Sequence, residues 1–250
     1  QKVLTDEATK NPPMTPTDTP LTDVTIGADG NPVVAVQAVR TSPHRLWAYI
    51  CLDPVCNTFR EVKLSGGPAE SFHPAVAIQK NGNPMFSYQS APSALQWTSC
   101  ADPLCESMTT KEVLNGVVSR LVRGSLTTDG LGNPVMLATR SADQRQVIVR
   151  CTDTTCTGRV VIELDDVASH GGAIALGTDG RLWVAYGATA ERDVRLFRCD
   201  AVACTSGTSQ EVAKDVLPVD GAFAGDLHVL PDGRPFMVYQ DSSGATASLA

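Results

Sequence analysis

Hydrophobic and polar residues alternate along this chain in short runs, and turns that contain glycine separate the runs. The alternation is clear in Val24/Ile26, Val76/Ile78 and Ile174/Leu176. Such alternation places apolar side chains on one face of a β-strand, and no segment has a helical period. The pattern therefore predicts an all-β chain built from many short strands.

A repeat organises these strands. A turn containing glycine, followed by a strand that mostly begins with proline, recurs at a period of about 50 residues. The turn glycines of the five copies are Gly30, Gly82, Gly132, Gly180 and Gly233. Each copy has room for four strands: one before the turn, one after it, a third that ends in cysteine, and a fourth. Repetition of a four-stranded meander predicts a five-bladed β-propeller of four-stranded antiparallel blades.

The fifth copy is split between the two ends of the chain. It stops about where its first cysteine would come, and residues 2–5 match the fourth-strand pattern of the other copies. We therefore expect the N-terminal strand to complete the last blade and to close the ring, so that 1–250 is a single propeller domain. The expected repeats are about 21–70, 71–120, 121–168, 169–220, and 221–250 together with 1–10.

The eight cysteines form four C-x4-C pairs, one in each of the first four copies. The pairs are Cys51/Cys56, Cys100/Cys105, Cys151/Cys156 and Cys199/Cys204. An even count at a repeated spacing favours disulfide bonds in an oxidising compartment. Each pair falls in the hairpin between the third and fourth strands, where we expect the two cysteines to face each other across the strands.

The alternative to disulfides is zinc, which usually takes C-x2-C pairs and needs two pairs to converge. Pairs that stand one to a copy around a ring would be held far apart. We expect four disulfides, no metal or other cofactor, and a secreted, periplasmic or cell-surface location.

Charge and hydropathy narrow the possible partners. The net charge is −7 and there is no run of lysine or arginine. Nucleic-acid binding needs a basic face, and so does attraction to an anionic membrane surface, so neither partner is expected. There is also no apolar stretch long enough to insert into a membrane.

The repeat resembles a known group of proteins. The turn and strand start Asp232-Gly-Arg-Pro235, together with the C-x4-C hairpins, resemble the repeats of secreted bacterial β-propellers over essentially the whole chain. In size and blade number the chain is similar to the tachylectin-2-type five-bladed lectins. It shares short Asp/Gly turns with the sialidase-like propellers but lacks their Ser-x-Asp-x-Gly-x-x-Trp box. The resemblance implies a propeller and carries no catalytic residue over.

Candidate binding residues follow from the blade pattern. We expect ligands at the face formed by the loops between blades and the loops that join second and third strands. The candidates on that face are Gln37, His73, Gln89, Arg123, His170, Asp226 and Gln240. The three glutamines share one blade position, where their amides could bind sugar hydroxyls or could cap strands and bond between blades.

Two further groups have alternative interpretations. Tyr88, Tyr186 and Tyr239 also share one position, and either stack on sugars or pack between blades. Asp165 and Asp166 either bind calcium or form a turn.

No nucleophile motif occurs, and every cysteine belongs to a pair, so we predict no catalytic residue. The leading hypothesis is a non-catalytic extracellular recognition or scaffold module that binds a glycan or a protein on its loop face. One alternative is a polysaccharide-acting hydrolase or lyase with His73, Arg123, His170 and Asp226 at the mouth of the central channel. Another is a structural subunit of a surface assembly.

Overall fold

The structure is a computed structural model that describes residues 22–38, 45–65, 71–90, 93–117, 125–218, 223–242 and 247–249. The chain divides into two compact units, Gln1–Asn115 and Gly116–Ala250. The regular elements of the described residues are all β-strands, which confirms the all-β prediction. No helix in this part of the chain is long and apolar enough to cross a membrane.

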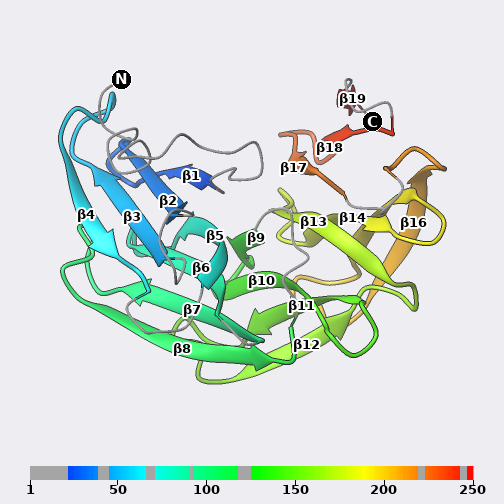
Figure 1. The fold of residues 1–250 in the computed structure, drawn as a ribbon, viewed down its shortest axis with the longest axis horizontal. Helices are drawn as coiled ribbons and strands as arrows, with labels where there is room; N and C mark the ends of the chain where they lie inside the picture. The colour runs from blue at the N-terminus through cyan, green and yellow to red at the C-terminus, as the bar shows by residue number, and fades with distance from the viewer. Residues whose placement is uncertain are drawn as a thin grey trace. The chain divides into compact units, whose positions relative to one another are not determined.

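The first unit contains two four-stranded antiparallel sheets, in which strands that follow one another in the chain are neighbours (Figure 1). The first sheet consists of β1 (Thr22–Ile26), β2 (Pro32–Ala38), β3 (Arg45–Cys51) and β4 (Phe59–Lys63). The second sheet consists of β5 (Ser71–Ile78), β6 (Pro84–Ser90), β7 (Ala94–Cys100) and β8 (Met108–Asn115). Ala35, Ile50, Val76 and Phe86 belong to one buried cluster that joins these two sheets.

The second unit contains the other three sheets. The third sheet consists of β9 (Ser125–Thr128), β10 (Pro134–Thr139), β11 (Gln146–Cys151) and β12 (Arg159–Glu163). The fourth consists of β13 (Ser169–Leu176), β14 (Leu182–Ala188), β15 (Asp193–Cys199) and β16 (Gly207–Ala213). The fifth consists of β17 (Gly225–Val229), β18 (Pro235–Gln240) and β19 (Ala247–Leu249). One apolar cluster, which includes Ile148 and Val184, joins the third and fourth sheets, and another, around Phe223, joins the fourth and fifth.

The five sheets correspond to the five sequence copies, and the order of strands within each sheet is the predicted meander. The fifth sheet has three strands among the described residues. The strand expected at 1–10 lies outside the described residues, as does most of 243–250. Closure of the ring by the N-terminal strand, and a single domain over 1–250, therefore stay predictions.

The turn chemistry explains how each sheet begins. Gly30 and Gly82 have φ values of 84° and 87°, the left-handed conformation that favours glycine. In the first turn, Oδ1 of Asp29 accepts a hydrogen bond from the backbone N–H of Asn31 at 3.0 Å. The next strand then starts at a proline, Pro32, where no ladder donor is lost.

All four predicted disulfides are present, and each closes the hairpin between the third and fourth strands of its sheet. They join Cys51 to Cys56, Cys100 to Cys105, Cys151 to Cys156, and Cys199 to Cys204. The described residues contain no free cysteine, so the pairing that the spacing predicted is confirmed.

The position of the second cysteine corrects the expectation that the two residues face each other across the strands. The first cysteine of each pair ends the third strand, but the second lies in the turn before the fourth strand begins. The ladder partner of Cys51 is Phe59, which comes after Cys56. The second cysteines all have a positive φ, which is 54° at Cys56, 54° at Cys105, 50° at Cys156 and 41° at Cys204.

A tight turn is the physical reason for this placement. The N–H of Cys56 donates to the carbonyl of Asp53 at 3.0 Å, and the N–H of Cys204 donates to the carbonyl of Ala201 at 3.0 Å. The turn reverses the chain within four residues, so the second cysteine reaches the first before the strands pair. An alternating pattern assumes an extended backbone and does not show this left-handed residue.

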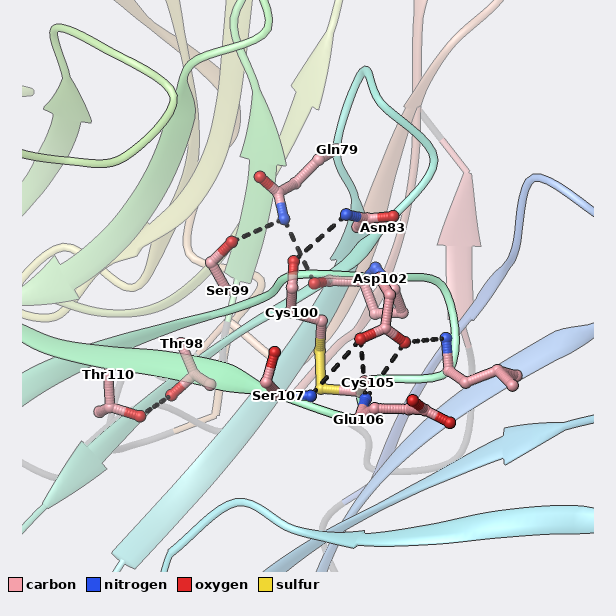
Figure 2. Close-up of a disulfide and its surroundings, with 12 residues drawn as sticks. Gln79, Asn83, Thr98, Ser99, Cys100, Asp102, Cys105, Glu106, Ser107 and Thr110 are labelled. Carbon is pink, nitrogen blue, oxygen red and sulfur yellow. Dashed lines mark hydrogen bonds between the residues drawn. A yellow bond between two sulfur atoms is a disulfide. The ribbon is translucent and has the colours of Figure 1, made fainter.

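An aspartate supports the turn in the second sheet. The carboxylate of Asp102 accepts backbone hydrogen bonds from Leu104, Glu106 and Ser107 (Figure 2). These bonds lower the pKa of Asp102. A disulfide and a backbone-binding aspartate therefore stabilise the same hairpin.

The first and third hairpins are built in the same way. Asp53 and Asp153 stand at the position of Asp102, and the carboxylate of each accepts hydrogen bonds from its own hairpin. The fourth hairpin differs, because Asp200 follows Cys199 directly and Ala201 takes the position of the aspartate.

Candidate functional site

Three of the predicted candidates lie close together in the first unit. Gln37 lies near the end of β2, and its Oε1 accepts a hydrogen bond from the backbone N–H of His73 at 3.2 Å. Gln89, on β6, is directly opposite Phe72 in the ladder, next to His73. Gln37 and Gln89 are both only 5% exposed. The amides therefore lie inside the protein, where Gln37 joins the first sheet to the second.

His73 has an unusual backbone conformation for a residue within a strand. Its φ is 53°, and the pairing of β5 with β6 shifts between Phe72 and Ala75, which marks a β-bulge. Bulges re-aim side chains and are common beside binding sites. Burial lowers the pKa of His73 to about 4, so the imidazole is neutral at pH 7. The ring lies 6.2 Å from the ring of Phe72, centroid to centroid, and both side chains are partly exposed.

The fourth sheet contains the same bulge in the second unit. Pairing of β13 with β14 shifts between His170 and Gly172, and Gly171 has a φ of 66°. Here Gln146, which is 1% exposed, donates from Nε2 to Oγ1 of Thr139 and to the carbonyl of Gly171, at 3.1 Å each. A buried glutamine thus supports the strand end in each unit. The sequence reasoning missed Gln146, whose signal is a lone amide at the start of an apolar strand.

The other candidates lie in the second unit or outside the described residues. The carbonyl of His170 accepts a hydrogen bond from the N–H of Phe223, which precedes β17. On β17, Asp226 accepts a hydrogen bond from the N–H of Leu227 at 2.9 Å. The N–H of Gln240 donates to the carbonyl of Ala224 at 3.0 Å. Arg123 lies outside the described residues.

The recurring tyrosines pack between sheets. The hydroxyl of Tyr88 donates to the carbonyl of Leu64, at the end of the first sheet, at 3.3 Å. The hydroxyl of Tyr186 donates to the carboxylate of Asp165, and burial together with this bond raises the pKa of Tyr186. Arg195 also binds Asp165, at 3.1 Å. Asp165 is therefore engaged by a tyrosine and an arginine, and the described residues contain no cluster of His, Cys, Asp and Glu suited to a metal ion.

No protein-family model matches the chain, and no curated protein matches it. Solved structures do. A protein of unknown function from Dyadobacter fermentans is 13% identical, with a TM-score of 0.63 over 91% of this chain and 74% of that chain. A Hadza microbial sialidase is 10% identical, with a TM-score of 0.64 over 92% of this chain and 54% of the sialidase. An α-L-arabinofuranosidase from Fusarium graminearum is 13% identical, with a TM-score of 0.60 over 92% of this chain and 79% of that chain.

These likenesses concern the fold. The matched structures are β-propeller-like, and several more of them are glycoside hydrolases. The chain spans about half the length of the sialidase. The fold is therefore of the β-propeller type that the repeat predicted, while the specific repeat family and the closure of five blades into a ring go beyond this comparison.

The expectation of a non-catalytic recognition or scaffold module is wrong. The matched structures that are named for an activity are mostly glycoside hydrolases, together with a sialidase, rather than binding modules. The error came from treating the lack of a short motif as the lack of an active site. A glycosidase needs two carboxyl groups placed across a sugar, and these groups need no fixed spacing in the sequence.

Proposed function

We propose that this protein is a carbohydrate-active enzyme that hydrolyses glycosidic bonds in a polysaccharide. The observation that carries the proposal is the five-sheet fold, which matches sugar-cleaving enzymes over about nine-tenths of the chain. The partly exposed imidazole of His73 supports it, because an imidazole can exchange hydrogen bonds with sugar hydroxyls.

Asp226 is the candidate carboxylate for acid–base chemistry. It is the acidic residue among the candidates, and its side chain is 57% exposed. Glycoside hydrolysis usually uses a pair of carboxyl groups, one of which protonates the leaving oxygen. In β1, Asp23 stands at the same repeat position, but its two carboxylate oxygens accept the N–H groups of Val24 and Val76. Asp23 therefore holds two strands together, whereas the contacts of Asp226 are within β17, to the N–H of Leu227 and, at 3.6 Å, to Nε2 of His228. The exposed carboxylate of Asp226 is the one we assign to the substrate.

The test is a substrate panel with a matched pair of variants. The purified protein is incubated with arabinan, β-1,3-galactan, xylan and a sialylated oligosaccharide, and released reducing sugar or sialic acid is measured. We expect the wild-type protein to cleave at least one substrate. Asp226→Asn should lower kcat by about a hundredfold or more at an unchanged melting temperature. Asp23→Asn should lower the melting temperature. No release from any substrate would overturn the proposal, and full activity in Asp226→Asn would remove Asp226 from it.

We also propose that the five sheets close into one ring, with residues 1–10 completing the fifth. Val24 and Ile26 on β1 are each 59% exposed, whereas Val76 and Ile174, the counterparts of Val24, are 4% and 9% exposed beneath a preceding sheet. A ring would give β1 a preceding sheet too. Val24→Asn should then lower the melting temperature by several degrees, while Val161→Asn, on the outer strand β12, should not. Equal and negligible effects would contradict closure.

We infer that the protein works outside the reducing cytosol. Its four short-range disulfides fit an oxidising compartment. Alkylation of the native protein from its source, followed by mass spectrometry, should find all eight cysteines protected. Labelled cysteines in freshly isolated protein would contradict this location.

A further inference from the structure

The left-handed bend at His73 occupies a position where the fourth copy of the repeat has glycine. Aligning the bulges of β5 and β13 places His73 at the position of Gly171. A Cβ atom on Gly171 would lie 2.2 Å from the carbonyl oxygen of Phe223, so that position accepts only glycine. A histidine at positive φ costs backbone energy that glycine would avoid. Strain of this kind, held in place by its surroundings, points to a use for the side chain.

The surroundings of His73 hold it in this conformation. The buried amide of Gln37 accepts the N–H of His73, which ties the bend to the neighbouring sheet. Pro74 follows directly, and a residue before proline favours an extended backbone, which adds to the energetic cost of the left-handed conformation at His73. Gln37 therefore acts as a positioning residue, and the imidazole is placed before any ligand arrives.

The side chains at the bend have the chemistry of a sugar site. The partly exposed ring of Phe72 lies beside the imidazole, and the two planes are tilted by 41°. An aromatic face packs against the C–H face of a pyranose or furanose. The Nδ1 atom of His73 is buried, so Nε2 is the ring nitrogen that can meet a sugar hydroxyl, as a donor or as an acceptor. Gln89 lies opposite Phe72 in the ladder and is buried beneath this strand end, inside the protein.

The charge of the site favours a neutral sugar. Burial keeps the imidazole of His73 uncharged at pH 7, so it offers no positive charge to a carboxylate. The whole chain carries a net charge of −7, which repels polyanions. Uronic and sialic acids are therefore poor ligands for this position.

We propose that Phe72 and His73 form a subsite for a neutral pentose or hexose unit of the substrate, with Gln37 as the positioning residue. The inference rests on the proposed glycosidase function and names the class of sugar that the enzyme takes. His73 and Phe72 contact the sugar, and the backbone strain at His73 is retained because it aims the imidazole at a hydroxyl group.

The test separates binding from stability. His73→Gly relieves the strain and removes the imidazole, and Phe72→Ala removes the aromatic face. Val55→Ala is the control, because Val55 is 73% exposed in the disulfide hairpin of the first sheet. Binding of arabinan, β-1,3-galactan and polygalacturonate is measured by affinity electrophoresis, and cleavage is measured in a separate assay. Both assays are run well below the melting temperature, and their results are divided by the fraction of folded protein.

We expect binding of a neutral polysaccharide but not of polygalacturonate. His73→Gly and Phe72→Ala should each weaken binding about tenfold, the effect of one lost hydrogen bond or stacking contact. The melting temperature of His73→Gly should stay the same or rise, and Val55→Ala should bind normally.

The subsite would be overturned by unchanged binding per folded molecule in His73→Gly and Phe72→Ala, or by binding of polygalacturonate alone. Wild-type protein that binds no polysaccharide also overturns it. Wild-type binding that depends on His73 but comes without cleavage leaves the subsite in place and refutes only the hydrolase function.

Discussion

The buried ion pair in the third sheet gives a quantitative test of the structure. Nε of Arg150 lies 2.8 Å from Oδ2 of Asp129, and their side chains are 9% and 0% exposed. Asp129 also accepts the N–H groups of Leu131 and Asn133 at 2.9 Å each. We expect Arg150→Met to leave a buried carboxylate without its cation, and Asp129→Asn to leave a buried guanidinium without its anion.

Removal of one member of a buried pair typically costs about 3 to 5 kcal/mol. The backbone donors around Asp129 remain in Arg150→Met, so we expect the lower end, about 3 kcal/mol. For a chain of this size that lowers the melting temperature by about 6 to 12 °C. The double variant should lose less than the sum of the two single losses, because it leaves no isolated charge.

The second sheet shows that a neutral pair can occupy these positions. Gln79 and Ser99 stand at the repeat positions of Asp129 and Arg150, and Nε2 of Gln79 donates to Oγ of Ser99 at 2.9 Å. Figure 2 shows this neutral pair beside the disulfide of the second sheet. The double replacement of Asp129 and Arg150 should therefore fold.

The control is the exposed pair in the fourth sheet. Arg198 precedes its cysteine as Arg150 does, and it binds Asp179 at the same 2.8 Å with side chains 43% and 42% exposed. Arg198→Met should cost about 1 kcal/mol or less. Stability is measured by urea unfolding followed by circular dichroism. Equal losses in Arg150→Met and Arg198→Met, or a double variant with fully additive losses, would refute the reasoning.

Three further predictions follow from backbone geometry, charge and cross-links. Gly171→Ala should destabilise the protein by about 2 to 4 kcal/mol, because the added Cβ meets a carbonyl oxygen. Gly30→Ala should cost only about 1 kcal/mol for its positive φ, because nothing lies within 4 Å of the added Cβ. Equal losses of stability in thermal unfolding would contradict this. Hydrogen bonds lower the pKa of Asp53 from 3.8 to about 2, so its stabilisation is present above about pH 4 and is lost as pH falls towards 2. An NMR titration midpoint near 3.8 would show that these bonds are absent. Replacement of Cys100 and Cys105 by serine should lower the free energy of unfolding in urea by about 2 kcal/mol, the value for a small closed loop. An unchanged free energy of unfolding would mean that the hairpin is ordered without its cross-link.

Much of the fold could be predicted because the signals are local. The third strand expected at Leu46–Cys51 is observed as β3, Arg45–Cys51, and the turn at Gly30 lies where the sequence placed it. The cysteine pairs needed only their own spacing. The bulges could not be predicted in the same way, because an alternating pattern assumes an extended backbone. Neither Phe72-His73 nor His170-Gly171 shows in its residue types which residue leaves the ladder.

The site was harder to predict because its contacts join separate repeats. The bond between Gln37 and His73 connects residues 36 positions apart in the chain, and no spacing rule links an amide to a backbone N–H in another sheet. The glutamines were correctly placed at one repeat position, yet their role depends on a neighbour. Gln37 bonds to a bend in the next sheet, and Gln146 supports a similar bend although it stands on a third strand rather than a second.

The pairing of each cysteine with one only five positions away has a consequence for how the chain matures. Eight cysteines can pair in about 105 ways, but each correct partner here is the closest one. Each cross-link can form as soon as its own hairpin has emerged from a ribosome or an export channel, without waiting for a distant segment. Oxidation then proceeds copy by copy from the N-terminal end, and an isomerase has little to correct. We therefore expect reduced, unfolded protein to regain its native pairing in air with few scrambled species.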